Sequence, residues 1–310
     1  MNNKSLIILG EQHTFTELEL RTLEKKFNSF LFIKYREEDT KNVIAQLSSF
    51  SKKKEGALIV LNTKASVPNT LLVYLSKREE KNIEYLTIKS FMSQYLKKCY
   101  IPAELRDISF LEEIKPFGKF EKILKVMIDY IFAIILLVLT SPFILYSVYK
   151  IKKESPGSIF FKQDRVGING EIFTCYKFRS MHENSHHDPY TREDDSRIFP
   201  WGNIMRKTRI DEIPQLINIF KGEMHLIGPR AEWNILVENY EKEIPYYHER
   251  HLVKPGITGW AQVNYPYGVN SEDTKQKLMY DLYYIKNWSL WLETRTVWKT
   301  IIVILNRRGI

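Results

Sequence analysis

Cysteine is scarce in this chain of 310 residues, which contains only Cys99 and Cys175. The two lie far apart and outside any Cys-x-x-Cys spacing. Neither a disulfide framework nor a zinc site is therefore indicated, and a reducing compartment fits best. A signal peptide is also lacking, because the apolar run within Met1–Gly10 is too short for one. No internal repeat and no low-complexity segment occur, so we expect a folded protein that is not carried across a membrane.

Acidic residues are fewer than basic ones, 37 against 46, which gives a formal net charge of +9. This balance suits nucleic acid, an anionic membrane surface or a phosphorylated substrate as a partner. The basic residues are spread along the chain and flank an apolar segment, a pattern that favours anionic lipid over nucleic acid. With 44% hydrophobic and 27% charged residues, the composition excludes wholesale disorder.

Residues 1–115 alternate short apolar runs with amphipathic stretches, which predicts a βαβ repeat and an α/β, Rossmann-like domain. The first strand-to-helix turn, Leu9–Thr14, contains one glycine where a dinucleotide-binding fingerprint has three. A structural or regulatory domain without a cofactor is therefore favoured over a nucleotide-binding one. The predicted strands are Leu6–Leu9, Phe30–Lys34, Ala57–Leu61 and Ile83–Ile88, and the predicted helices are Thr16–Lys26, Lys41–Phe50 and Asn69–Arg78.

Long hydrophobic runs are limited to one, residues 131–149, the only stretch that approaches the length of a bilayer. A buried core helix and a simple spanning helix are two interpretations of it. Pro142 favours a third, because it cannot donate to the carbonyl of Val138 and kinks the helix, while the Ser141 hydroxyl can satisfy part of the freed backbone. Lysines flank both ends, whereas a spanning helix carries its cations mainly on the cytoplasmic side. Residues 116–150 are therefore predicted to form a re-entrant membrane helix with both ends on the cytoplasmic face.

Residues 151–310 are dense in glycine, proline, arginine and aromatic residues, and they predict an α+β domain with short strands and short helices. A β-hairpin is expected where Phe160–Arg165 and Ile172–Lys177 flank the turn Val166–Gly170. Further helices are expected at Glu232–Glu241, Ser271–Tyr284 and Trp288–Leu305, the last as an amphipathic helix along the membrane interface.

Residues 181–200 form a polar loop in which His182, His186, His187 and Asp188 resemble a metal cluster. A loop has no helical or strand register to fix the geometry of metal ligands. We therefore expect no functional metal there.

The acidic pair Asp211-Glu212 is the most informative feature of the sequence. Taken alone it fits ordinary helix punctuation, because Thr208-x-x-Asp211 matches a capping box and acids complement the dipole of a first helical turn. Phosphoryl transfer, however, needs positive charge on the nonbridging oxygens and a nucleophile in line with the leaving oxygen. Either carboxylate can attack phosphorus to give an acyl-phosphate, and its neighbour can bind Mg²⁺. The candidate cations are Arg206, Lys207, Arg209, Lys177 and Arg179.

Three other motifs are rich in glycine, proline and arginine. Phe161–Gly167 contains Arg165, and Gly228-Pro-Arg230 is a turn that presents one guanidinium, a planar fork suited to phosphate. A loop arginine paired with a surface acid is the alternative. The turn that contains Pro255, Gly256 and Thr258 either lines a binding site or is simply a β-turn.

Together and in order, these motifs resemble the bacterial sugar transferase family, the monotopic phosphoglycosyl transferases that start lipid-linked glycan assembly. The resemblance covers about Phe117 to Ile310 and says little about residues 1–115. The motifs that carry it are Ser141-Pro142 in the hydrophobic helix, Phe161-x-Gln-x-Arg165-x-Gly167, Lys177-Phe-Arg-Ser-Met181, Arg206-Lys-Thr-x-x-Asp211-Glu-x-Pro-Gln215, Gly228-Pro-Arg230 and Pro255-Gly-Ile-Thr-Gly-Trp-Ala-Gln262.

The resemblance implies that a sugar-1-phosphate passes from a UDP-sugar to a polyprenyl phosphate, usually undecaprenyl phosphate, with release of UMP and a requirement for Mg²⁺. It implies that Asp211 is the nucleophile of a covalent phosphosugar intermediate, and that Glu212 holds Mg²⁺ or assists proton movement. It also implies a monotopic protein of the inner membrane with its catalytic domain facing the cytoplasm. The candidate residues for substrate or phosphate binding are Arg230, Lys177, Arg179, Arg206, Arg165, Pro255, Gly256 and Thr258.

The chain departs from the family pattern at two places. Ala231-Glu232 stands where the family commonly has a second proline, and Gly222-Glu-Met-His225 stands where it commonly has Gly-Asp-Met-Ser. Both lie beside the candidate site and can alter the choice of sugar. A catalytically inert membrane scaffold or nucleotide-sugar sensor is the alternative function, and assembly into a homo-oligomer is left open.

Overall fold

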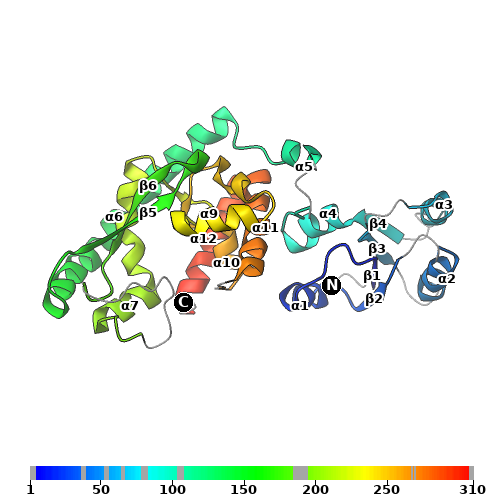
Figure 1. Cartoon of the computed structure of the whole chain (residues 1–310), viewed down its shortest axis with the longest axis horizontal. Helices are drawn as coiled ribbons and strands as arrows, with labels where there is room; N and C mark the ends of the chain where they lie inside the picture. The colour runs from blue at the N-terminus through cyan, green and yellow to red at the C-terminus, as the bar shows by residue number, and fades with distance from the viewer. Residues whose placement is uncertain are drawn as a thin grey trace. The chain divides into compact units, whose positions relative to one another are not determined.

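The computed structural model describes residues 5–35, 40–51, 56–63, 67–77, 83–102, 108–183, 195–266, 268 and 270–306. Two compact units make up the chain, Met1–Tyr100 and Ile101–Ile310 (Figure 1). The sequence predicts divisions after residues 115 and 150, and these divisions stay predictions.

A parallel four-stranded sheet with the order β2-β1-β3-β4 lies at the centre of the first unit. The predicted strands and helices are all present, which confirms the α/β pattern; the closer likeness to a Rossmann domain stays a prediction. One prediction is wrong in detail, because Ile88 begins the helix α4 and does not end the strand β4. The strands are β1 (Ser5–Leu9), β2 (Ser29–Ile33), β3 (Ala57–Leu61) and β4 (Ile83–Thr87), and the helices are α1 (Glu17–Glu24), α2 (Thr40–Ser51), α3 (Asn69–Ser76), α4 (Ile88–Phe91) and the π-helical η3 (Met92–Leu96).

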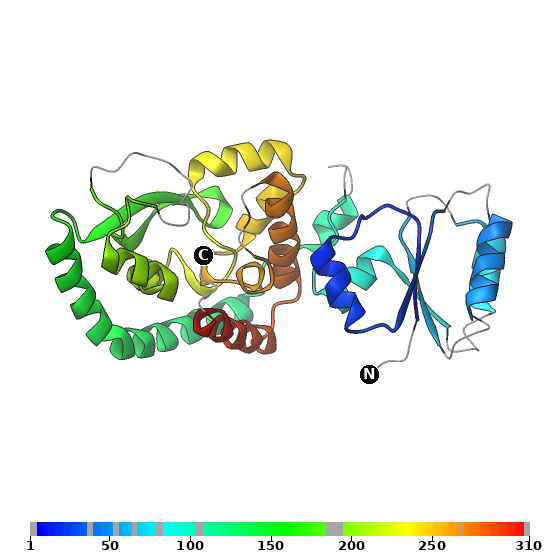
Figure 2. The same cartoon turned by 90° about the horizontal axis from the view of Figure 1, so that it is seen from below.

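Helices cover both faces of this sheet (Figures 1 and 2). On one face, Ile7 and Ile59 pack with Leu47 of α2 and Leu71 of α3. The helices α1 and α4 lie on the opposite face. A parallel strand that is covered on both sides needs to be apolar along its length, which is why the central strands β1 and β3 appear in the sequence as apolar runs. The edge strand β4 is more polar and more exposed, contrary to the prediction of a buried strand.

The turn after β1 is fixed by side chains of the chain itself. Gly10 has a positive φ of 95°, and a Cβ there would lie 2.4 Å from the carbonyl oxygen of Asn62, so only glycine fits. The Asn62 amide donates to the carbonyls of Gly10 and His13 and accepts from the His13 N–H. Next to it, the buried Glu19 accepts from Lys98 and pairs with His13. The backbone groups of this turn are thus bonded from within the unit.

The second unit begins with α5 (Ile108–Glu113) and continues into one very long helix, α6 (Lys119–Glu154). Figure 2 shows that α6 is bent, as a proline in a helix interior leads us to expect. The missing N–H of Pro142 leaves the carbonyl of Val138 without its helical partner, and the Ser141 hydroxyl donates to that carbonyl at 2.8 Å. The sequence motif Ser141-Pro142 therefore has a direct structural explanation.

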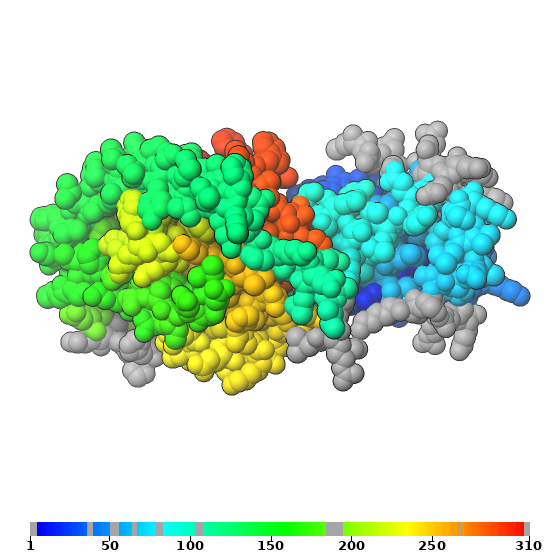
Figure 3. All heavy atoms as spheres, turned by 90° about the horizontal axis from the view of Figure 1, so that it is seen from above, coloured from blue at the N-terminus to red at the C-terminus, as the bar shows by residue number. Residues whose placement is uncertain are grey.

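Most of α6 has no protein covering it. By length and composition it is the one helix in the described residues that could cross a membrane, and only 11% of its most apolar 18-residue stretch is buried. This exposure argues against the interpretation of a buried core helix, because so much bare apolar surface needs a non-aqueous cover. Atoms of α6 form a continuous margin of the second unit in Figure 3.

Both ends of the apolar stretch of α6 pack on the same folded unit. Ala133 packs with Leu216 and Ile219, whereas Ile151 packs with Phe178 and Met205. A helix that enters one leaflet and turns back on the same side is compatible with these two contacts.

The predicted β-hairpin is confirmed: β5 (Phe160–Val166) and β6 (Ile172–Phe178) pair antiparallel around a tight turn. The predicted helices at 232–241, 271–284 and 288–305 are confirmed with shifts of a few residues. The remaining elements are α7 (Pro200–Thr208), η5 (Ile210–Gln215), α8 (Leu216–Phe220), β7 (His225–Ile227), α9 (Asn234–Glu243), η6 (Tyr247–Leu252), β8 (Gly256–Thr258), α10 (Trp260–Asn264), α11 (Ser271–Lys286) and α12 (Leu290–Leu305).

A buried polar network ties the start of α6 to the centre of the unit. Lys125 lies 2.9 Å from Glu293 of α12 and 3.3 Å from Asp129. Asp129 in turn lies 2.6 Å from the Nδ1 atom of His225, on β7. Tyr284 donates to the same Glu293. Since β7 leads directly into Gly228-Pro-Arg230, this network fixes α6 relative to the arginine of the candidate site.

Candidate active site

The acidic pair lies in a 3₁₀ turn that follows a sharp change of direction. Helix α7 ends at Thr208, and Arg209 adopts a left-handed conformation with φ 59° and ψ 16°. This conformation is uncommon for a residue other than glycine. Thr208 donates to the carbonyl of Ile204 at 2.7 Å, and no side chain caps η5 at its start. The capping box expected from Thr208 and Asp211 is therefore wrong, because the threonine hydroxyl is used inside α7, whereas both acids do lie in the first turn of η5.

Glu212 organises three cations from three different parts of the unit. Its Oε1 atom accepts from Lys177 of β6 at 2.9 Å and from Arg230 at 3.2 Å, and its Oε2 atom accepts from Arg209 at 3.3 Å. The side chain is buried. Burial alone would raise the pKa of Glu212, but Lys177, Arg230 and Arg209 outweigh it and hold that pKa well below its ordinary value. Glu212 is therefore an ionised anchor for positive charge.

Asp211 differs from Glu212 in its exposure, its partners and the direction in which its pKa is shifted. It is partly exposed, and within the described part of the chain its carboxylate has no hydrogen bond or ion pair. Burial and the negative charge of Glu212 raise the pKa of Asp211 to about 6, against the opposing effect of Lys177 and other nearby cations. Two adjacent carboxylates with different environments and separated pKa values are typical of a pair that divides two chemical tasks.

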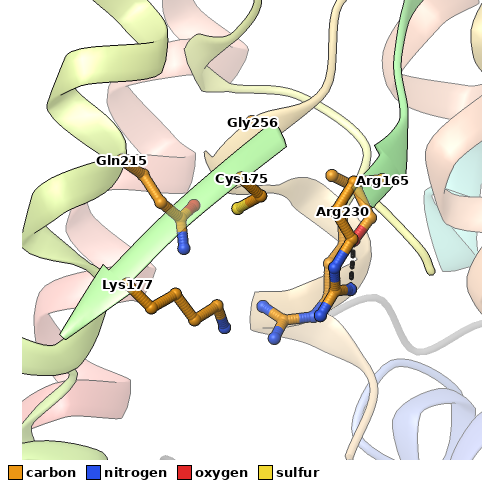
Figure 4. A pocket seen from close by; sticks show the side chains of 7 residues that line it. Arg165, Cys175, Lys177, Gln215, Arg230 and Gly256 are labelled. Carbon is orange, nitrogen blue, oxygen red and sulfur yellow. Dashed lines mark hydrogen bonds between the residues drawn. The ribbon is translucent and has the colours of Figure 1, made fainter. Parts of the chain in front are cut away.

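A cavity of about 210 Å³, open to solvent, lies beside the cations that Glu212 holds. Figure 4 shows Lys177 and Arg230 directed into it from opposite sides, with Gln215 above Lys177 and Cys175 between the two sides. Its lining residues are Arg165, Cys175, Lys177, Gln215, Arg230, Ala231 and Gly256. None of these residues is acidic, so the cavity is electropositive.

The structure brings four of the predicted binding residues together in this cavity. Arg165 reaches it from β5, where its guanidinium donates to the carbonyl of Ala231 at 2.7 Å. Gly256 lies on β8, and a Cβ there would be 2.1 Å from the backbone nitrogen of Gly228. Glycine is thus required for the close approach of β8 to the loop that carries Arg230.

Other predicted residues lie outside the cavity. The guanidinium of Arg179 donates to the hydroxyl and carbonyl of Ser155 and to the carbonyl of Ser158. Arg179 therefore makes structural contacts that hold the backbone at Ser155 and Ser158. Thr258 shares a hydrogen bond with Thr300 of α12 at 2.8 Å. The carbonyl of Pro255 accepts from the backbone N–H of His225. Arg206 is half-buried, and its positive charge opposes the rise in the pKa of Asp211.

Two lining residues carry no predicted role, namely Gln215 and Cys175. Gln215 stands in the same sequence motif as the acidic pair, four positions after Asp211. One turn of 3₁₀ helix and Pro214 bring it back beside the pair. Cys175 and Lys177 are two positions apart on β6, so their side chains point to the same face of the strand. The alternation of side chains along this predicted strand would have placed Cys175 on the same face as the candidate residue Lys177.

The carboxylates fit a divalent cation only in part. The Oε1 atom of Glu212 already accepts from two cationic side chains, whereas Oε2 accepts from Arg209 alone and keeps one lone pair for a metal. The described residues contain no group of three His, Cys, Asp or Glu side chains placed to hold a metal ion. His182 shares a hydrogen bond with Ser155, whereas His186, His187 and Asp188 lie outside the described residues. A requirement for Mg²⁺ stays a prediction.

Residues 120–307 match the family model of the bacterial sugar transferases. This match covers all of α6 except Lys119, the hairpin, the acidic pair and α12, and it extends over more than half of the chain. The chain belongs to the bacterial sugar transferase family.

Relatives with assigned names support the same family. A UDP-N-acetylgalactosamine-undecaprenyl-phosphate N-acetylgalactosaminephosphotransferase of Aeromonas hydrophila is 47% identical over 183 residues, which are 58% of this chain and 43% of the relative. A UDP-glucose:undecaprenyl-phosphate glucose-1-phosphate transferase of Xanthomonas campestris is 40% identical over 189 residues, 59% of this chain and 39% of the relative. An uncharacterized sugar transferase of Bacillus subtilis is 39% identical over 192 residues, which are 61% of this chain and 90% of the relative. The chain thus spans about two fifths of the length of the first two relatives.

Proposed function

We propose that this protein transfers a sugar-1-phosphate from a UDP-sugar to undecaprenyl phosphate, through a covalent intermediate on Asp211. One observation carries the proposal: the Asp211 carboxylate, which has no partner among the described residues, lies next to the Glu212 carboxylate, which holds Lys177, Arg209 and Arg230 in place. The first group is available for bond formation. The second concentrates positive charge where a phosphoryl group would come to lie.

The reaction proceeds in two displacements. An oxygen of Asp211 attacks the phosphorus that carries the sugar and forms a P–O bond to it. The bond from that phosphorus to the bridging oxygen breaks, and UMP leaves with the bridging oxygen. An oxygen of undecaprenyl phosphate then attacks the same phosphorus, and the Asp211 carboxylate is released. Lys177 and Arg230 stabilise the nonbridging oxygens in both displacements. The product is a sugar linked through a diphosphate to the lipid.

The membrane-facing surfaces support a lipid-linked acceptor. Helix α12, which pairs with α6 through Lys125 and Glu293, exposes a row of bulky apolar side chains on its other face: Leu290, Trp291, Val297, Trp298, Ile301, Ile302 and Leu305. Apolar and aromatic residues on one face suit a helix that lies in the membrane interface. We infer a monotopic attachment to the cytoplasmic face of the inner membrane through α6 and α12. This attachment would present the acidic pair to an acceptor embedded in lipid.

An assay of UMP release tests the proposal. Purified protein in detergent or nanodiscs receives a panel of UDP-sugars, beginning with UDP-N-acetylgalactosamine and UDP-glucose, with and without undecaprenyl phosphate and with and without Mg²⁺. We expect UMP to appear in a stoichiometric burst without the lipid and in continuous turnover with it. Binding of UDP-sugars without any UMP would instead support the inert scaffold or sensor.

A further inference from the structure

We propose that Gln215 is a phosphate-binding residue, whose side-chain amide donates a hydrogen bond to an oxyanion held by Lys177 and Arg230. This inference rests on the proposed function and adds a neutral donor to a site otherwise made of cations.

The first observation is that the side-chain amide of Gln215 lines the cavity and, within the described part of the chain, has no hydrogen-bond partner. Only 4% of the residue is exposed. Figure 4 shows its amide nitrogen on the side of Lys177 and Arg230, facing the cavity. A buried amide is normally hydrogen-bonded, and an exception calls for a ligand or another explanation.

A neighbouring amide shows what a structural side chain looks like in the same segment. Asn218, one turn further along, is fully buried and donates to the carbonyl of Thr174 and to Glu223, each at 2.7 Å. It also accepts from the backbone N–H of Tyr176 at 3.1 Å. Asn218 is saturated by the protein, whereas Gln215 is left open toward the cavity.

A second donor on the cavity wall also lacks an acceptor. The Nε atom of Arg165 is buried without a partner, although its other guanidinium nitrogens donate to Ala231 and Gln163. Burial lowers the pKa of Arg165, as does the positive charge of Arg230 nearby. An anion with several acceptor oxygens would accept hydrogen bonds from the donors without partners and would offset the repulsion between the cations around the cavity.

The size of the cavity selects the part of the substrate that enters. The value of about 210 Å³ includes the open mouth, so the space that the walls enclose is far smaller than a nucleotide, a sugar or a lipid requires. Only phosphate oxygens can therefore reach the donors on its walls, while the uridine, the sugar or the lipid stays outside. The phosphate can come from the donor or from the acceptor, since each is a phosphate ester.

The test compares two substitutions of nearly equal size. Gln215→Met removes both hydrogen-bonding atoms, and Gln215→Glu replaces the donor by a negative charge. We expect Gln215→Met to slow the reaction by about 10- to 100-fold, because a hydrogen bond to a charged group is lost, and Gln215→Glu to slow it further by repulsion. Gln276→Met is the matched control, since Gln276 is a buried amide of α11 that pairs with Glu272 away from the cavity.

Two half-reactions identify the source of the phosphate. The rate of the UMP burst without lipid reports on the donor, and the decay of preformed adduct on addition of undecaprenyl phosphate reports on the acceptor. Slowing of either half-reaction by Gln215→Met supports the inference and names the substrate. Wild-type rates in both half-reactions, for Met and Glu alike, would overturn it. Absence of a UMP burst in the wild-type protein would instead remove the proposed function.

Thermal unfolding separates a binding role from a structural one. An unpartnered buried amide contributes nothing to stability by hydrogen bonding, so Gln215→Met should leave the midpoint of unfolding unchanged or raise it. A lowered midpoint together with lowered activity would contradict the inference, because it would show that Gln215 supports the fold.

Discussion

Lys177 Nζ lies 2.9 Å from Glu212 Oε1, and the two residues are 35 positions apart in the sequence. Because Arg230 and Arg209 donate to the same carboxylate, Glu212 positions the side chains of all three cations. In this arrangement Glu212 holds three cations, and the metal-holding role that the family resemblance implies stays a prediction.

Substitution of Glu212 by glutamine tests its role in holding the cations. Glu212→Gln keeps the size of the side chain but removes the charge that attracts the cations. We expect the UMP burst to slow by at least about 100-fold and the free energy of unfolding to fall by roughly 2 kcal/mol, since the cations keep partial access to solvent. Burst kinetics and chemical denaturation measure the two effects. A burst at the wild-type rate would show that the cations need no anchor.

The pH dependence of the first half-reaction follows from Asp211. Only the ionised carboxylate is a nucleophile, and the pKa of Asp211 is raised to about 6. The burst rate should therefore fall about tenfold per pH unit below that value and level off above it. Glu212→Gln removes one cause of the raised pKa, so the midpoint should move to lower pH in that variant. A rate that is flat from pH 5 to 8 would contradict the assignment of Asp211.

The buried network at the start of α6 predicts a large loss of stability. Lys125→Met would leave the buried carboxylates of Asp129 and Glu293 without their shared cation, and the free energy of unfolding should fall by about 3–5 kcal/mol. Lys122→Met is the control, because Lys122 is exposed on the same helix. Denaturation in detergent compares the two. Equal, small effects would show that the network contributes little.

The orientation of α6 can be tested by labelling. Lys122 and Lys152 are exposed near its two ends, while Cys99 and Cys175 are buried. Single variants Lys122→Cys and Lys152→Cys, in sealed inside-out membrane vesicles, should both react with an impermeant maleimide, because a re-entrant helix keeps both ends on the cytoplasmic face. Reaction of only one of them would indicate a spanning helix.

Much of the fold was predictable because local patterns encode it. The central strands of the first unit are apolar runs, the hairpin is marked by its glycine-containing turn, and α6 is marked by hydrophobicity over many residues. The order β2-β1-β3-β4 is not encoded locally, since it depends on which strands pair across the whole unit. The sequence analysis missed the helix α4 because Ile88, its first residue, is a β-branched apolar residue of the kind that favours strands.

The candidate site was predictable in its chemistry but not in its geometry. The acidic pair and the arginines stand in recognisable motifs, so the sequence indicates which residue types meet. It does not indicate that the Arg179 guanidinium would donate its hydrogen bonds to Ser155 and Ser158, or that Glu212 would hold Lys177 and Arg230. Those contacts join segments far apart in the sequence, and only tertiary structure decides them.

Mass spectrometry of the protein after incubation with a UDP-sugar alone tests the central claim most directly. Rapid quenching and peptide mapping should find a mass increase equal to one sugar-phosphate on the peptide that contains Asp211. The increase should be lost on addition of undecaprenyl phosphate and absent from Asp211→Asn. Continuous product formation by the wild-type protein without any such adduct, or by Asp211→Asn at a wild-type rate, would contradict the account.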